Sequence, residues 1–251
     1  MLKEIIIAVQ AWLQAHRFIV KHRLWKWIFI PGIIYAALFT LGIWLFWRSS
    51  GYFIQYSLAH TGIKEWLEGL NNAGYVFIFL VIQIAVQIIL FYFYFSLFKY
   101  LFLIIGSPVF AYLSEKTQSI IDGKNYPFSF KQFSKDVIRG IKLASRNALW
   151  QTVYSVCILL LAFIPVFGLA TAVLAFFVEC YYLGFSMLDY SCERNKLSAQ
   201  QSIVFIGRHK GLAIGNGIIF YSMHAMPFLG WVLAPGYAVI AATISLNNSK
   251  N

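Results

Sequence analysis

The chain has 251 residues, of which 60% are hydrophobic and only 12% are charged, and its mean hydropathy is +0.70. Soluble globular domains carry about 45–50% apolar and about 25% charged residues, so this composition excludes an ordinary soluble domain. The formal net charge is +11, yet Lys and Arg lie beside the apolar segments, which is typical of membrane topology and not of nucleic-acid binding. We therefore expect one integral membrane domain over residues 1–251.

The first two predicted elements are an amphipathic helix and a membrane span. Residues 1–26 have helical periodicity, with Trp12 and Ile19 on an apolar face and Arg17 on a polar face. This pattern predicts an N-terminal helix that lies in the headgroup region. Residues 27–47 form an apolar run, and about 20 such residues cross the ~30 Å hydrocarbon core. They are expected to be the first transmembrane helix.

The middle of the chain contains a longer apolar run followed by the most polar block. Residues 74–105 are predicted to be the second transmembrane helix, tilted or projecting beyond the bilayer because of its length. Gly106-Ser107-Pro108 is expected to end that helix. Residues 106–148 then form a basic helical segment that we expect on the cytoplasmic side. Its cations recur at helical spacing: Lys131, Lys135, Arg139, Lys142 and Arg146.

Two later apolar segments, each interrupted by a Pro-x-x-Gly sequence, are predicted to be helical hairpins. In the second, Pro235-Gly236 is expected to break the helix again and to leave a last arm of about 11 residues, or about 16 Å. Such an arm cannot cross about 30 Å of hydrocarbon, so the second hairpin is predicted to be re-entrant, whereas the first either crosses or dips. Re-entrant turns need cover from protein or a water-filled cavity, which favours a conduit or an oligomer interface. The segments are residues 149–188, with Pro165 and Gly168, and residues 212–246, with Pro227 and Gly230.

The distribution of positive charge predicts the orientation. Lys and Arg number five before residue 27, two in residues 48–73, seven in residues 106–148 and four in residues 189–211. The positive-inside rule then places both termini on the cytoplasmic side of the cell (inner) membrane. The same count fits two spans or six, so it does not decide whether the hairpins cross.

Known catalytic and metal-binding motifs are missing from the sequence, including HExxH, CxxC, GxGxxG and GxSxG. We therefore expect no enzymatic activity, cofactor or metal. Glu179 and His224 are candidate polar residues inside the membrane, where ionisable groups are costly and often functional. Glu179 could equally lie at the membrane interface, and His224 could be a hydrogen-bonded packing residue.

Five short segments, taken in chain order, resemble the CysZ-type sulfate permease family. They correspond to the family's Gly-Leu-Arg segment, Pro-Phe helix exit, Asp-Tyr-Pro-x-x-Arg element, Gly-Phe-Gly element and final Pro…Pro…Ala-Thr hairpin. In this chain they read Ala15-His16-Arg17, Ser107-Pro108-Val109-Phe110, Leu188-Asp189-Tyr190 with Arg194, Gly215-Asn216-Gly217, and Met226-Pro227 through Ala234-Pro235 to Ala241-Ala242-Thr243.

The resemblance implies two long transmembrane helices and two half-penetrating hairpins, assembled as a homo-oligomer that moves sulfate. It also implies that Arg17 is the principal anion contact. Ala15 and His16 replace the glycine and leucine of the family segment. His16 and Arg23 would add positive charge, since guanidinium groups bind oxyanions in a bidentate manner.

The leading hypothesis is a permease or channel for sulfate or a similar small oxyanion, with the hairpin turns lining its conduit. Its expected partners are the lipid bilayer, the anion and further copies of the chain. The alternative is a non-transporting membrane scaffold whose basic cytoplasmic face, with Lys135, Arg139 and Lys142, binds anionic lipid or a partner. The basic N-terminal segment could also be an ordinary topology anchor.

Overall fold

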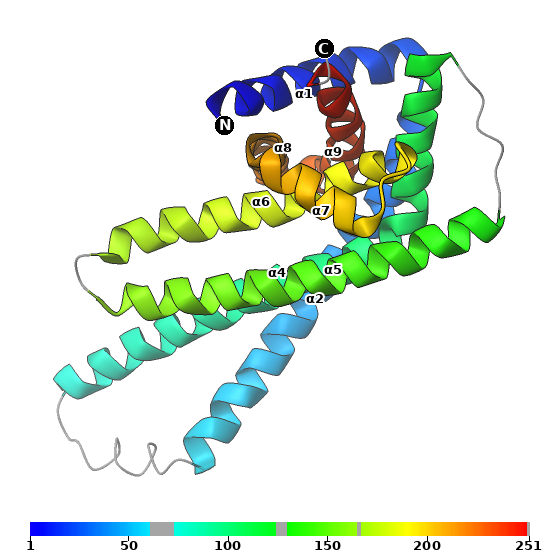
Figure 1. The fold of residues 1–251 in the computed structure, drawn as a ribbon. Helices are drawn as coiled ribbons and strands as arrows, with labels where there is room; N and C mark the ends of the chain where they lie inside the picture. Colours follow the sequence, from blue (N-terminus) through cyan, green and yellow to red (C-terminus); the bar gives the residue numbers. More distant parts are fainter. Residues whose placement is uncertain (61–72, 124–129, 165–166, 250–251) are drawn as a thin grey trace. The chain divides into compact units, whose positions relative to one another are not determined.

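Helices make up nearly all of the described chain (Figure 1). The computed structural model describes residues 1–60, 73–123, 130–164 and 167–249, and those residues contain no strand. The all-α class predicted from the sequence is confirmed. The helices are α1 (Leu2–His22), α2 (Trp25–His60), α4 (Ala73–Asp122), α5 (Phe130–Ala162), α6 (Gly168–Arg194), α7 (Ala199–Arg208), α8 (Lys210–His224) and α9 (Leu229–Asn248).

The chain forms two compact units, of which the smaller comprises residues 37–99. Within this unit, parts of α2 and α4 pack through aromatic side chains. The ring centroids of Phe46 and Phe91 lie 5.2 Å apart, and those of Phe39 and Phe95 lie 5.4 Å apart. Edge-to-face and tilted ring pairs at such distances are favourable, so aromatic contacts hold the two helical segments of this unit together.

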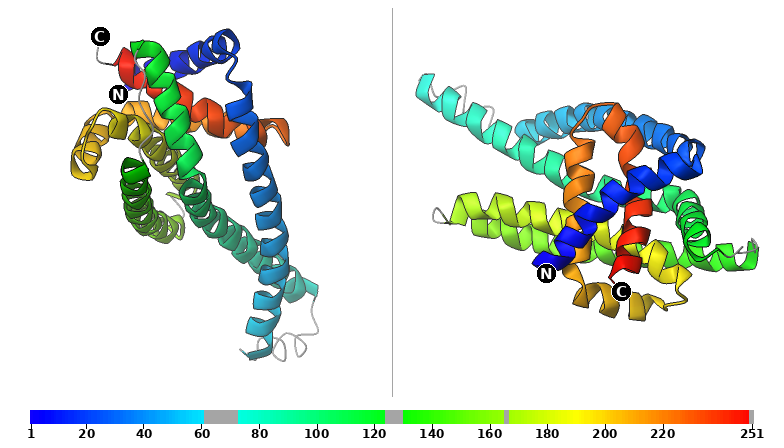
Figure 2. Two further views of the ribbon diagram at one scale, coloured as in Figure 1. Left: turned by 90° about the vertical axis from the view of Figure 1, so that its right-hand side faces the viewer. Right: turned by 90° about the horizontal axis from the view of Figure 1, so that it is seen from above.

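The larger unit comprises residues 1–36 and 100–251 and is built around α9. Helix α1 lies across α8 and α9, and α6 packs against both of them (Figures 1 and 2). The run from Ala238 to Ala242 is completely buried. An apolar helix enclosed by three others forms the core of this unit and positions the elements on its surface.

Small residues bring α6 and α8 into close contact. Cys180 and Gly184 lie one turn apart on α6, and Ala213 and Gly217 lie one turn apart on α8. A Cβ at Gly184 would overlap the backbone carbonyl of Ala213, and a Cβ at Gly217 would overlap that of Cys180. This reciprocal small-xxx-small pattern is the usual device for close helix packing in membranes.

The predicted helix break at Gly106-Ser107-Pro108 is wrong, because α4 continues through it to Asp122. Pro108 lacks the N–H that would bond the carbonyl of Ile104, one turn earlier. The hydroxyl of Ser107 donates to that carbonyl at 2.9 Å instead. A side-chain donor therefore satisfies the freed carbonyl, and the second apolar run and the start of the predicted polar block form one helix.

The predicted break at Pro235 is also wrong, because Pro235 lies inside α9, which runs from Leu229 to Asn248. The 20 residues of α9 extend about 30 Å, so the argument that the last arm is too short to cross fails. Ala234, Pro235 and Gly236 are all buried. Helix interiors in membranes tolerate proline where neighbouring helices cover the freed carbonyl.

Two other predicted boundaries do not coincide with helix ends. Helix α2 continues beyond residue 47 to His60. Helix α5 joins the basic segment to the first arm of the first hairpin without interruption at residue 148. Both predicted boundaries coincide with a change of hydropathy, and a change of polarity does not by itself end a helix.

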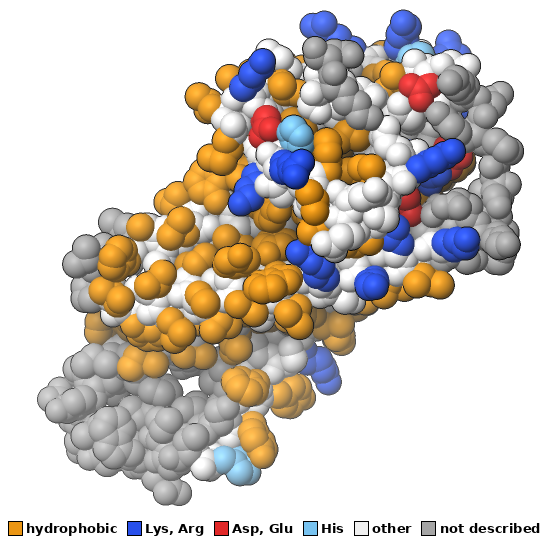
Figure 3. Space-filling view, viewed as in Figure 1, with side chains coloured by type: hydrophobic (Ala, Val, Ile, Leu, Met, Phe, Trp, Pro, Cys, Tyr) orange, Lys and Arg blue, Asp and Glu red, His pale blue; other side chains and the backbone are white. Residues whose placement is uncertain are grey.

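Four helices are long and apolar enough to cross a membrane, judged by the length and composition of the described residues. Large apolar side chains remain exposed at the end of the α5–α6 hairpin, where Phe163 is 76% and Leu160 is 63% exposed. Figure 3 shows hydrophobic side chains covering this end of the hairpin, while Lys and Arg gather along the other part of α5. Such a surface suits lipid and not water. The four spans are Trp25–Phe53, Leu80–Asp122, Ala170–Arg194 and Leu229–Asn248.

Candidate functional site: a basic hollow beside the N-terminal helix

Hydrogen bonds tie the inner face of α1 to α8. The indole Nε1 of Trp12 donates to Oδ1 of Asn216 at 3.0 Å, and both side chains are buried. One carboxylate oxygen of Glu4 lies 2.8 Å from Nδ1 of His209, and the other accepts the backbone N–H of Gly211 at 3.0 Å. These contacts fix the rotation of α1, so its cationic face is turned away from the core.

Helix α1 ends at His22 because Arg23 adopts the left-handed conformation, with φ 52° and ψ 44°. The N–H of Arg23 donates to the carbonyl of Val20, and the N–H of Leu24 donates to that of Ile19. This pair of bonds is the Schellman motif. The motif leads directly into α2, so the end of α1 and the start of the first candidate span are adjacent.

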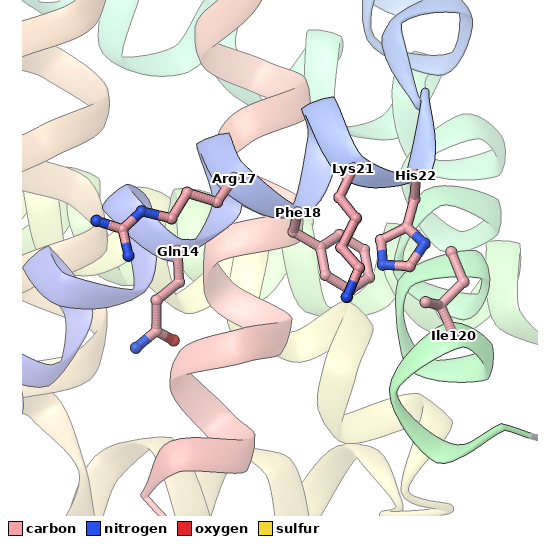
Figure 4. Close-up of a pocket in the computed structure, with 6 residues that line it drawn as sticks. All are labelled: Gln14, Arg17, Phe18, Lys21, His22 and Ile120. Atoms are coloured by element: carbon pink, nitrogen blue, oxygen red, sulfur yellow. The ribbon is translucent and has the colours of Figure 1, made fainter.

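An open hollow of about 400 Å³ lies beside this end of α1 (Figure 4). Residues of α1 and one residue from the C-terminal part of α4 line it. Neither Arg17 nor Lys21 forms a hydrogen bond or ion pair with the described part of the chain. Fixed positive charge that is not neutralised attracts anions. The lining residues are Gln14, Arg17, Phe18, Lys21, His22 and Ile120.

Of the four residues predicted from the sequence to contact an anion, only Arg17 lines the hollow. Ala15 is completely buried against the core. Nδ1 of His16 lies 2.8 Å from the hydroxyl of Tyr237 on α9. Arg23 forms the C-cap of α1 and does not line the hollow. The four predicted residues therefore lie on different faces of α1 or at its end, and they do not form one site.

The other five lining residues were not among the predicted anion contacts, and three of them show why. Lys21 lies one helical turn after Arg17, and His22 follows it, so helical periodicity could have placed both near Arg17. Ile120 comes from the distant end of α4. No local pattern in the sequence indicates that this residue meets α1.

Glu179 lies inside the larger unit, where its exposed fraction is 9%. Its Oε1 accepts a hydrogen bond from the amide of Gln151, and its Oε2 accepts one from the hydroxyl of Tyr221 at 3.0 Å. The hydroxyl of Tyr100 donates in turn to Gln151. The four residues come from α6, α5, α8 and α4, so one polar network joins four helices.

His224 is a hydrogen-bonded residue at the end of α8. Its Nε2 lies 2.6 Å from the hydroxyl of Tyr35 on α2. Among the described residues, no three His, Cys, Asp or Glu side chains are arranged to hold a metal ion. The geometry around His224 therefore supports hydrogen bonding.

The predicted turn residues do not all lie in turns. Pro227 lies between α8 and α9 and is a turn residue, whereas Pro235 lies inside α9. Gly168 and Gly230 fall in the first turns of α6 and α9. Pro165 lies outside the described residues.

Residues 11–235 match a family model described as Sulfate transporter CysZ/Etoposide-induced protein 2.4. The match covers most of the chain, from the middle of α1 through the first hairpin to the start of α9. The chain belongs to this family. The resemblance inferred from short sequence segments is thus confirmed.

Several curated relatives in the CysZ family are named "Sulfate transporter CysZ". One from Pectobacterium atrosepticum is 29% identical over 153 residues, which cover 59% of this chain and 55% of the relative. One from Pseudomonas fluorescens Pf-5 is 25% identical over 149 residues, which cover 59% of each chain. The aligned region therefore spans less than three fifths of each relative's length. Family membership and four apolar helices together identify a multi-pass membrane protein.

The segment that resembles the Asp-Tyr-Pro-x-x-Arg element of the CysZ family forms a buried ion pair. Nη2 of Arg139 donates to Oδ1 of Asp189 at 2.8 Å, and Nη1 lies 3.4 Å from Glu193. Arg139 is thus neutralised by carboxylates and does not belong to a lipid-facing basic surface. Lys135 and Lys142 are exposed. The scaffold alternative therefore loses one of its three expected cations.

Proposed function

We propose that this protein lets sulfate, or a similar small oxyanion, cross the cell membrane. Membership of a family whose described members include sulfate transporters carries this proposal. The exposed, unneutralised cations of α1 support it, because a transported anion needs a site of positive charge to enter.

Arg17 is the proposed principal anion contact. Its guanidinium group is exposed and makes no hydrogen bond to the described residues, so its donors are available for a bidentate oxyanion contact. His16 lies next to it and is oriented by Tyr237. His16 and Arg23 would act as auxiliary charges, and Ala15 supports the segment from the core side.

The proposed arrangement in the membrane retains both termini on the cytoplasmic side and a re-entrant second hairpin. Helix α8 has 15 residues and extends about 22 Å, less than the ~30 Å hydrocarbon core. The basic clusters next to α1, α5 and α7 support a cytoplasmic location for these segments. The turns at Gly168 and Pro227, with Gly230, would line the conduit, and homo-oligomer formation would cover backbone exposed at membrane depth.

Uptake of labelled sulfate into liposomes that contain the purified protein tests the proposal. We expect uptake above that of protein-free liposomes. We expect Arg17→Gln to raise the sulfate concentration that gives half-maximal uptake about tenfold or more, since hydrogen bonds to charged groups contribute about 1.5–3 kcal/mol. Lys142→Gln removes an exposed cation from α5 and should leave uptake unchanged. Uptake no greater than in protein-free liposomes would refute transport. Equal effects of the two substitutions would refute the role of Arg17.

A further inference from the structure

The hollow beside α1 has two distinct sides. Figure 4 shows the side chains of Lys21, Phe18 and His22 gathered beside Ile120, whereas the guanidinium group of Arg17 extends in the opposite direction. The rings of Phe18 and His22 lie 4.5 Å apart, which confirms that they are neighbours. On this side of the hollow Lys21 forms a cationic rim, and Phe18 and Ile120 form an apolar floor.

The size and lining of the hollow do not suit a bare oxyanion. A volume of about 400 Å³ falls in the range of pockets that hold a small organic molecule, and sulfate is far smaller. Phe18 and Ile120 offer no hydrogen bond to an oxyanion. An apolar floor beside a cationic rim instead fits a ligand in which an anionic group is attached to hydrocarbon.

The position of the hollow indicates where such a ligand would come from. Its Lys21 and His22 precede by a few positions the candidate span that starts at Trp25. Because the first candidate span begins beside the hollow, we expect the hollow to lie close to the lipid headgroups. Trp25 and Trp27 are aromatic residues of the type that prefers this level.

We propose that Lys21 and His22 bind the phosphodiester of an anionic phospholipid whose glycerol and upper acyl carbons rest on Phe18 and Ile120. Lys21 has no ion-pair partner among the described residues, so its charge is available to the phosphate. The Lys21 ammonium would contact the phosphate oxygens, and an imidazole N–H of His22 would donate a second hydrogen bond. This lipid site lies on the side of the hollow away from the Arg17 guanidinium group, and the proposal does not depend on sulfate transport.

Lipid binding to the purified full-length chain tests this site. The protein in detergent is titrated with phosphatidylglycerol or, separately, with zwitterionic phosphatidylcholine, and bound lipids are counted by native mass spectrometry. We expect phosphatidylglycerol to bind more tightly. Lys21→Gln should weaken its binding about fivefold, the factor for one cation near an anionic membrane surface. Ile120→Gln, which makes the floor polar, should weaken binding of the same lipid.

Lys3→Gln is the matched control, because Lys3 is an exposed cation at the other end of the same helix. It should leave phosphatidylglycerol binding unchanged. Equal binding of the two lipids, an unchanged affinity in Lys21→Gln, or an equal loss in Lys3→Gln would overturn the proposal.

Inorganic phosphate and sulfate form a third arm of the titration. If either binds in a manner that depends on Lys21 while phosphatidylglycerol does not, the site is one for a free oxyanion and the lipid proposal is wrong. Sulfate flux is measured separately, so a failure of transport and a failure of lipid binding are distinguishable.

Discussion

Replacing Gly184 by alanine should destabilise the contact between α6 and α8. The new methyl group would overlap the backbone carbonyl of Ala213, and its next neighbours are also backbone atoms of that residue. No flexible side chain can move aside to accommodate it. The two helices must therefore separate, which would also loosen the second close contact, between Gly217 and Cys180.

The expected size of the effect follows from two opposing contributions. Inserting a methyl group into a well-packed core costs about 1–3 kcal/mol, and the upper value applies because the obstacle at Ala213 is backbone. Alanine favours the helical conformation over glycine by about 1 kcal/mol. The net loss for Gly184→Ala is therefore about 2 kcal/mol, which for a chain of this length lowers the Tm by about 4–8 °C.

Thermal unfolding of the purified protein in detergent, followed by intrinsic fluorescence, measures this change. Gly207→Ala is the matched control, because a Cβ at Gly207 in α7 meets no heavy atom within 4 Å. The control should keep the Tm of the parent protein or raise it slightly. A Tm for Gly184→Ala equal to or above that of the parent would refute the proposed close contact.

Two further substitutions test the buried polar contacts by the same measurement. Arg139→Gln would leave the buried carboxylate of Asp189 without its cation and should lower the free energy of unfolding by about 3–5 kcal/mol. The control Lys142→Gln on the same helix should change it little. Equal Tm values for the two variants would contradict the ion pair. Trp12→Phe removes the donor to Asn216 and leaves a buried acceptor unsatisfied, so it should lower the free energy of unfolding by about 1–3 kcal/mol. An unchanged Tm would show that this hydrogen bond does not hold α1 in place.

The sequence predicted features that depend on local pattern. The period of α1 placed Trp12 and Ile19 on its buried face and Arg17 on its exposed face, as the structure confirms. Long apolar runs gave the membrane class, because composition alone requires lipid as solvent. Prolines were a less reliable guide. Pro108 does not end α4, since the neighbouring Ser107 supplies the missing donor to a carbonyl one turn earlier.

Contacts between distant parts of the chain could not be predicted. Arg139 meets Asp189, and Ile120 joins the residues of α1, only because the helices fold against one another. A cation at helical spacing gives the same sequence pattern whether it faces a carboxylate or water. Arg139 was therefore grouped with Lys142, although only one of the two is neutralised within the protein.

The hydrogen bonds beneath α1 have a consequence for any anion that binds above it. Peeling α1 from the surface would break the hydrogen bonds of Asn216 and Glu4 and expose the buried Trp12 and Ile19 to water, so the helix keeps a fixed orientation. The backbone that carries Arg17 and Lys21 is thus ordered before a ligand arrives. A loose basic tail would lose conformational entropy on binding, whereas this preorganised helix loses only the freedom of its side chains.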